Sequence, residues 1–340
     1  MSRSKPAVRK LHELKPGEMA DFFAVLSERE KRATRDGKPF YSCKFRDGRR
    51  AATCMVWSDD ARFAECEGEW RPGLFFKIRA TYGEHPQFGP KLDIHNLRIA
   101  LDADRADGFV ESELIDCSRY SPDEMLTELC DLAVESIVDE PLRKLVLNVL
   151  EANAAKIKML PASPRNYYPF PGGWLEHTLS VTKKCWFLTE RYREQNADLT
   201  PPLNRDLVMA GAMLHEIGRV AELQPGLAPN EPAEQTVPGR LFGHLALGRD
   251  LVREAARQIP ELNAQLLQLL EHVLLSYLTL PEWGSPRLPM IPEVLILHHA
   301  DDLDAKMEMY TRCLRKDVAP GPFTERDPIL GKPLLKAREV

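Results

Sequence analysis

The sequence LVMAGAMLHEIGR, residues 207–219, indicates an apolar helix that ends near Gly218 with His215 and Glu216 side by side. Burying an imidazole and a carboxylate in apolar surroundings costs free energy unless both have partners. Imidazole nitrogen and carboxylate oxygen are also ligands that suit divalent metal ions. This stretch therefore predicts a helical core organised around a polar centre.

Similar positions lie in apolar helical stretches before and after it. They are His177 in GGWLEHTLSV, His244 in LFGHLALG, His272 in LLEHVLLSY and Asp301 in LILHHADDLDAKM. One histidine on an apolar helix face is usually a hydrogen-bonded core residue. Five such positions in one helical region favour a metal site, with Mn²⁺, Mg²⁺, Fe²⁺ or Ni²⁺ as candidate ions in one or two copies.

The helical pattern extends over residues 121–315. Ser121 followed by Pro122 and two acids is a typical helix start. The expected helices are 121–138, 140–155, 173–193, 203–216, 240–258, 261–279 and 290–314. We expect a polar, acidic linker at 101–120 before this all-helical domain, and a proline-rich extended tail at 316–340 after it.

Residues 12–100 have a different pattern, with short strands separated by turns. The expected strands are 19–26, 39–45, 51–57, 74–82 and 91–97. Asp36-Gly37 and Asp47-Gly48 are strong turn signals. Five strands without a convincing amphipathic helix predict a small β-barrel of the OB-fold type.

Aromatic and basic side chains interleave in this barrel, which favours nucleic-acid binding. Small barrels of this type hold single strands by stacking bases on aromatic rings along a cationic track. Residues 1–100 contain 20 Lys and Arg against 14 Asp and Glu, although the whole chain has a net charge of -5. Phe40 and Tyr41 are adjacent, so one of them must face outward in a strand. The candidate nucleic-acid-binding residues are Phe40, Tyr41, Lys38, Arg46, Arg49, Arg50 and Trp57, with core packing as the alternative for Trp57.

The composition, 44% hydrophobic and 29% charged, is that of an ordinary globular protein. No run of about 18 apolar residues is present, so we expect no membrane partner. The charged N-terminus lacks the apolar segment of a secretory signal. Seven scattered cysteines without a CxxC pair indicate reduced thiols, and hence a cytoplasmic protein.

The order of these segments resembles the YhaM branch of the HD superfamily. The matching segments are GKPFYSCKFRDGRRAATCMVW in the barrel, GGWLEHTLSV and AMLHEIGR in the helical region, then HVLLS, EWGSPRLP, ILHHADDLDAKM and GPFTERDPILGKPLLK. The resemblance implies an α+β multidomain chain, in which an N-terminal five-stranded OB-fold barrel precedes an all-α HD-type metal phosphohydrolase domain. It also implies metal-dependent 3′-5′ exonuclease activity on single-stranded RNA or DNA, and a multimeric assembly that no repeat in the sequence indicates.

The resemblance assigns roles to individual residues. It implies first-metal ligands at His177, His215, Glu216 and Asp301, and second-metal positions at His244 and His272. Arg219 stands where a lysine is usual and is a candidate to hold a phosphate oxygen, which makes Glu216 and Arg219 the candidate catalytic residues.

Three departures from the family pattern fall in this site. Glu216 replaces an aspartate, Tyr277 and Leu278 replace two histidines, and Tyr167-Tyr168 replaces another histidine pair. They leave two alternatives to an active nuclease open. One is a nucleic-acid-binding protein with a degenerate, weakly active or inactive HD domain, and the other is a nucleotide phosphohydrolase. A mononucleotide needs no stacking platform, so the barrel argues against the phosphohydrolase.

Some neighbouring residues have less specific expectations. We expect His298 to be packed or to support the site, and Asp304 to lie on the helix surface or face the substrate. Tyr167 and Tyr168 are candidates to stack a terminal base.

Overall fold

The computed structural model describes residues 8–85, 89–115, 117–226 and 233–336. The chain divides into two compact units. One unit is Met1–Asp116 with Leu227–Glu231 and Arg312–Val340, and the other is Cys117–Gly226 with Pro232–Thr311.

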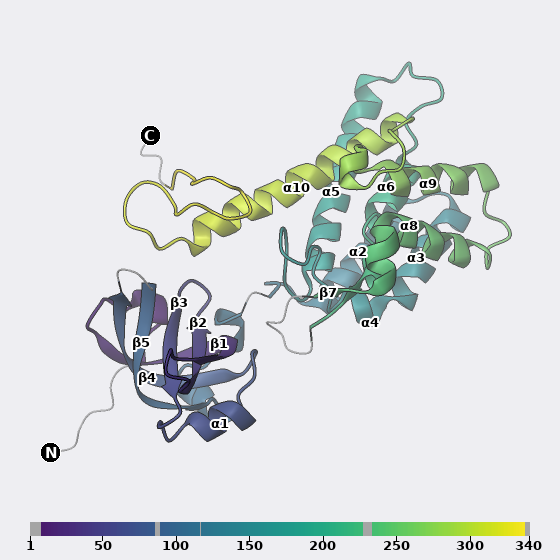
Figure 1. Cartoon of the computed structure of the whole chain (residues 1–340). Coiled ribbons are helices and arrows are strands. Elements are labelled where there is room, and N and C mark those ends of the chain that lie inside the picture. The colour runs from purple at the N-terminus through teal and green to yellow at the C-terminus, as the bar shows by residue number, and fades with distance from the viewer. Residues whose placement is uncertain (1–7, 86–88, 116, 227–232, 337–340) are drawn as a thin grey trace. The chain divides into compact units, whose positions relative to one another are not determined.

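The N-terminal unit contains a closed five-stranded barrel with the strand order β1-β2-β3-β5-β4 (Figure 1). The strands are β1 (Met19–Ala33), β2 (Pro39–Arg46), β3 (Ala51–Trp57), β4 (Phe75–His85) and β5 (Gly89–Ile99). All pairs are antiparallel except β3 with β5. Inward-facing aromatic side chains, among them Phe45, Trp70 and Phe76, fill the interior. The expected OB-type barrel is therefore confirmed, with a short helix α1 (Phe63–Gly68) that the sequence pattern did not indicate.

The segment expected to be a linker, 101–120, begins as part of the barrel unit, so that expectation is wrong for its first half. A 3₁₀ helix, Asp102–Asp107, follows β5 directly. Phe109 and Leu114 are buried against Phe23 of β1. Asp104 is also buried, because Lys77 and Arg98 of the barrel both donate to its carboxylate. Acidic residues that suggested a solvated linker are thus ion-pair partners of the barrel.

The second unit is helical (Figure 1). Its helices are α2 (Pro122–Ser136), α3 (Glu140–Ala152), α4 (Ala154–Ile157), α5 (Gly173–Gln195), α6 (Arg205–Leu214), α7 (Arg219–Glu222), α8 (Val237–Ala256), α9 (Ala264–Ser276) and α10 (Pro292–Lys316, which extends beyond the unit). Two short strands, β6 (Leu223–Gln224) and β7 (Glu234–Gln235), pair between α7 and α8. All seven expected helices are present, and α4 and α7 are additional short ones.

Helix α6 lies at the centre of this unit, and the packing around it positions the polar centre. Every residue from Leu207 to Leu214 is buried. Helices α5, α9, α2 and α3 pack against it. Side chains that leave α6 at its C-terminal end therefore enter the interior of the unit. Among the described helices, none combines the length and apolar character needed to cross a membrane.

Gly218 is required where α7 crosses α8. A Cβ at this position would lie 1.9 Å from the His244 carbonyl oxygen and 2.6 Å from the Gly248 nitrogen. We expect Gly218→Ala to destabilise the helical unit by about 1–3 kcal/mol or more, because the backbones must move apart. Thermal unfolding followed by circular dichroism at 222 nm measures this. Gly68→Ala is the control, because a Cβ there meets nothing within 4 Å; equal melting of both variants would contradict the close-approach argument.

Candidate metal centre

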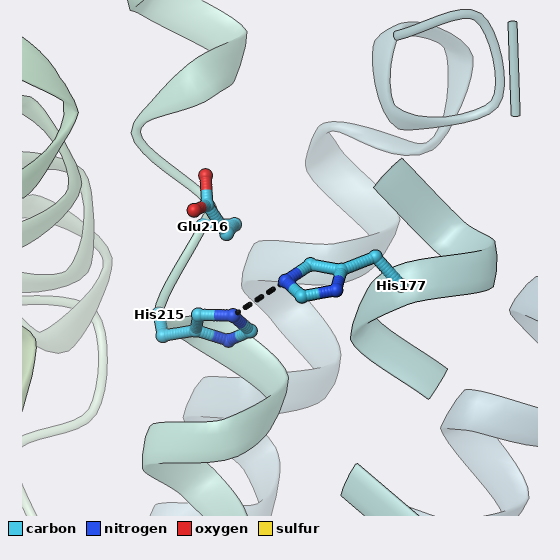
Figure 2. Close-up of side chains that lie close together, drawn as sticks. All are labelled: His177, His215 and Glu216. Carbon is cyan, nitrogen blue, oxygen red and sulfur yellow. Dashed lines mark hydrogen bonds between the residues drawn. The ribbon is translucent and has the colours of Figure 1, made fainter. Parts of the chain in front are cut away.

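Three side chains from three helical segments converge in the interior of the helical unit. His177 lies on α5, His215 follows α6 directly, and Asp301 lies on α10. The two Nε2 atoms are 3.4 Å apart, and Asp301 Oδ1 is 3.0 Å from His177 Nε2 and 3.6 Å from His215 Nε2. Figure 2 shows the two imidazole rings turned toward each other. Ligands about 2.0–2.2 Å from a shared ion lie roughly 3–3.6 Å from one another, so the spacing fits one metal ion.

The hydrogen bonds of the two imidazoles leave their Nε2 atoms available. His177 Nδ1 bonds to Asp304 Oδ2 at 2.8 Å, and His215 Nδ1 bonds to the Ala212 carbonyl oxygen at 2.7 Å. Both partners are acceptors, so each Nδ1 donates a proton to them and each Nε2 is the atom that would coordinate a metal ion. Among the described residues, the buried Asp301 Oδ1 has no hydrogen-bond partner. Two facing Nε2 atoms and this carboxylate oxygen form a donor set that a divalent cation fits.

The electrostatics of these side chains express the same requirement. Burial lowers the pKa of His177, but the carboxylates of Asp301 and Asp304 outweigh it and raise that pKa to about 10. Burial raises the pKa of Asp301, yet His177 and His215 hold it below its ordinary value. The pocket therefore takes up a proton where a metal ion would otherwise supply the positive charge.

Asp304 lies in the interior, so the expectation of a helix-surface or substrate-facing position is wrong. It is 3% exposed and lies three residues from Asp301, on the same face of α10. Besides His177 it accepts hydrogen bonds from Ser180 Oγ and Lys184 Nζ, each at 2.6 Å. Burial opposes ionisation, but His177 and Lys184 lower the pKa of Asp304 to about 2. The ionised carboxylate fixes the tautomer and the orientation of His177.

Replacing Asp304 by asparagine should weaken metal binding by about 10–100-fold without removing the ion, because the carboxylate that orients His177 would be lost. Isothermal titration of the metal-free protein with Mn²⁺ measures the affinity. Asp302→Asn is the matched control, because Asp302 is on the same helix and pairs with exposed Lys306 at 2.7 Å. Wild-type affinity in Asp304→Asn would contradict the orienting role.

Glu216 lies beside the three ligand atoms but has hydrogen-bond partners of its own. One of its carboxylate oxygens is within 4.8 Å of ligand nitrogens of His177 and His215. Its Oε1 accepts from Tyr167 Oη at 3.0 Å and Tyr277 Oη at 3.2 Å, and its Oε2 accepts from Arg219 Nε. Burial raises the pKa of Glu216, but the charge of Arg219 outweighs this and, with the histidines nearby, lowers it to about 2.

The other expected metal and phosphate residues lie outside the group of His177, His215 and Asp301. His244 Nε2 bonds to Tyr277 Oη at 3.0 Å. His272 Nε2 instead accepts the Met290 backbone N–H at 3.0 Å, which fixes the loop after α9. Arg219 is directed inward, toward Glu216 and Glu222, so a phosphate would have to compete with two carboxylates for it.

Two tyrosines cover the His177 ring, a role that the sequence did not indicate. The rings of Tyr167 and Tyr168 lie 5.0 and 5.5 Å from His177, centroid to centroid. Burial and neighbouring carboxylates hold the pKa of Tyr167 well above its ordinary value, so it stays a hydroxyl donor to Glu216. Stacking on a terminal base is therefore not the role in which the structure places these rings. His298 is packed as expected, against Trp283 and the Tyr277 carbonyl.

The barrel carries a separate groove of about 630 Å³ on the outer face of β1, β2 and β3, with part of the β4–β5 hairpin. Alternation along β2 and β3 places Phe40 and Trp57 opposite each other on this face, with ring centroids 4.8 Å apart. Trp57 is 40% exposed and lines the groove with Met55 and Arg32. An exposed Trp57 beside a half-buried Phe40 is a stacking surface at the end of the groove.

The remaining expected barrel residues are distributed differently. Tyr41 points into the core, which corrects its expected binding role, and donates to Glu67 at 3.1 Å. Arg50 donates to the carbonyl oxygens of Leu11 and Leu14 and therefore ties the N-terminal segment to the barrel. Lys38 forms an exposed ion pair with Asp59. Arg46 and Arg49 lie at the far end of the β2–β3 hairpin, roughly 20 Å from Phe40 along the strand.

Known proteins are similar to this chain at two levels: a family model matches the helical unit, and full-length relatives match nearly the whole sequence. The HD domain family matches residues 174–306. The chain is 29% identical over 318 residues to the 3′-5′ exoribonuclease YhaM of Bacillus subtilis (strain 168), covering 93% of each chain. The protein of the same name from Geobacillus sp. (strain WCH70) is 28% identical over 311 residues, covering 91% of this chain and 89% of its own.

Among solved structures, a domain of replication protein A from Methanococcus maripaludis is similar to 27% of this chain, with 93% of that domain covered, 16% identity and a TM-score of 0.22, too low to bear on the fold. The fold comes instead from the strand order of the barrel and the helices described above. The helical unit therefore matches the HD domain family, and the chain is similar along 93% of its sequence to proteins named 3′-5′ exoribonuclease YhaM.

Proposed function

We propose that this protein is a metal-dependent exonuclease that shortens single-stranded RNA from its 3′ end. The observation that carries the proposal is the convergence of His177 Nε2, His215 Nε2 and the orphaned Asp301 Oδ1 within 3.6 Å of one another. It occurs in a chain similar over most of its length to proteins named 3′-5′ exoribonuclease.

In this proposal His177, His215 and Asp301 hold the ion, and Asp304 keeps the His177 imidazole in its ligating tautomer. Held by these residues, a divalent cation would supply Lewis acidity for the phosphodiester and would lower the pKa of a water molecule. The tyrosines over His177 exclude bulk water from one side of the site. Mn²⁺, Fe²⁺ or Ni²⁺ suits two imidazoles and one carboxylate better than Mg²⁺, which prefers oxygen ligands.

The barrel supplies the binding surface for the strand in this proposal. Phe40 and Trp57 stack bases, and the basic side chains beside the groove, Arg32, Arg62 and Lys44 among them, face the phosphates. RNA is preferred to DNA in the proposal only because of the names of the matched relatives. No disulfide joins any of the seven cysteines, all of which lie in the described residues, and this supports a reducing compartment such as the cytoplasm.

One observation favours the alternative, a nucleic-acid-binding protein with a weakly active HD domain. Glu216 and Arg219 are paired with each other rather than open toward a substrate. An enzyme would have to hydrolyse RNA with the ion at His177, His215 and Asp301 and without help from Glu216 or Arg219. A binding protein would need only the groove of the barrel.

The test is the shortening of single-stranded RNA, labelled at its 5′ end, by the purified protein with Mn²⁺, Mg²⁺ or EDTA. Progressively shorter labelled products with Mn²⁺, blocked by a 3′-phosphate, would support the 3′-5′ exonuclease. Binding without shortening under any metal would leave the binding protein. Free nucleotides incubated in parallel test the phosphohydrolase, and their hydrolysis in place of RNA would contradict the proposal.

A further inference from the structure

The polar residues next to the three ligand atoms form a second cluster, which already contains a cation. We name it the Glu216 cluster: Glu216, Arg219, Glu222 and His244, with the hydroxyls of Tyr167 and Tyr277. Glu216 follows α6, Arg219 and Glu222 begin and end α7, and His244 lies on α8. The cluster is interior, since Glu216 and Glu222 are buried and the Arg219 side chain is 11% exposed.

Arg219 lies between the two carboxylates. Its Nε donates to Glu216 Oε2, its Nη1 to Glu222 Oε2 at 2.5 Å, and its Nη2 to Glu216 Oε1 at 3.3 Å. A guanidinium remains protonated in proteins, so this is a fixed positive charge. Without it, two buried carboxylates would face each other, an arrangement that is unstable unless another cation takes its place.

The groups around Arg219 have the chemistry of a divalent cation site. His244 Nδ1 is 3.5 Å from Glu222 Oε2, and His244 Nε2 is 3.9 Å from Glu216 Oε1. Two carboxylates and an imidazole are ligands for the same ions that suit His177, His215 and Asp301. The two sets differ in one respect. Asp301 Oδ1 lacks a hydrogen-bond partner, whereas both Glu216 oxygens have partners.

We propose that the protein binds one divalent cation, at His177, His215 and Asp301, and that the Arg219 guanidinium fills a second cation position formed by Glu216, Glu222 and His244. The inference rests on the proposed function only for the presence of the first ion. Glu216 is then neutralised by the chain itself, and Arg219 is a positioning residue that holds its carboxylate by hydrogen bonds.

The experiment counts the Mn²⁺ ions bound per chain by native mass spectrometry, after equilibration of the full-length protein with excess Mn²⁺. We expect one ion in the wild type and two in Arg219→Ala, where removal of the guanidinium opens the second position. Arg219→Lys, which keeps a positive charge, should bind one. Arg253→Ala is the control, because Arg253 forms a two-bond ion pair with Glu271 at 2.5–2.6 Å that lies outside the cluster; it should bind one ion.

Two ions in the wild type, or one in folded Arg219→Ala, would overturn the inference. Where Arg219→Ala does not fold, Arg219→Gln replaces it, since glutamine retains much of the volume and removes the charge. The count is independent of catalysis. Two ions in a wild type that trims RNA would overturn this inference and leave the proposed function intact. One ion in a wild type that does not trim RNA would leave this inference intact and overturn the proposed function.

Discussion

Asp301→Asn should lose its bound metal ion and trim RNA more than about 100-fold more slowly than the wild type. The substitution preserves the size of the side chain but removes the charge and one oxygen of a direct ligand. The decrease in metal affinity should be larger than the decrease of about 10–100-fold expected when a group that only orients a ligand is removed. His215→Ala should have the same effect, because His215 Nε2 is 3.6 Å from the same carboxylate oxygen. Both are measured as the rate of 3′-end shortening of labelled RNA and as Mn²⁺ retained after gel filtration.

Asp302→Asn is the control for both variants. It makes the same Asp-to-Asn change one position further along α10, and it should leave the trimming rate and the retained Mn²⁺ unchanged. Circular dichroism verifies that each variant is folded. Trimming at the wild-type rate by folded, metal-free Asp301→Asn would show that the hydrolysis takes place elsewhere.

Removal of the exposed ring of Trp57 should weaken binding to single-stranded RNA by about 10–100-fold, because one stacked base contributes about 1–3 kcal/mol. The double variant Phe40→Ala/Trp57→Ala should bind more weakly still, since the two rings form one surface with their centroids 4.8 Å apart. Fluorescence anisotropy with a labelled oligonucleotide at fixed salt measures the dissociation constant. The rate of trimming at saturating RNA should change little, because neither residue lies in the helical unit.

Phe187→Ala is the aromatic control, because Phe187 is 70% exposed on α5 and lies outside the barrel. Unchanged affinity in Trp57→Ala, or an equal loss in Phe187→Ala, would place the binding surface away from the groove of β1, β2 and β3.

The burial of His177 and His215 could be predicted from the sequence, because each occurs in an apolar stretch typical of a buried helix. The burial of α6, with His215 at its end, could be expected for the same reason. The partners of these residues could not. Asp304 belongs to a charged run on α10, and only the rotation of the helix against α5 decides that it faces His177 rather than solvent.

The charges were the least predictable part of the chain, because a residue type does not reveal its partner. Arg219 looked like a phosphate ligand, yet Glu222, one helical turn away, already neutralises it. Arg50 looked like part of a cationic track, but backbone carbonyls of the N-terminal segment bind it. In the barrel the alternation of β2 decided between neighbours: Phe40 faces out and Tyr41 faces in.

The hydrogen bonds of Asp304 have a consequence for how a metal ion would enter. The carboxylate binds His177, Ser180 and Lys184, all on α5, while its own helix carries Asp301. These bonds tie α10, which carries Asp301, to His177 on α5, so the two proposed ligands are held near each other by the fold itself. A flexible chelator loses conformational entropy when it binds an ion. Here that loss has already occurred during folding. If the proposed ion binds here, the pocket would act as a preorganised chelator, and the rigid spacing of its side chains would set its selectivity.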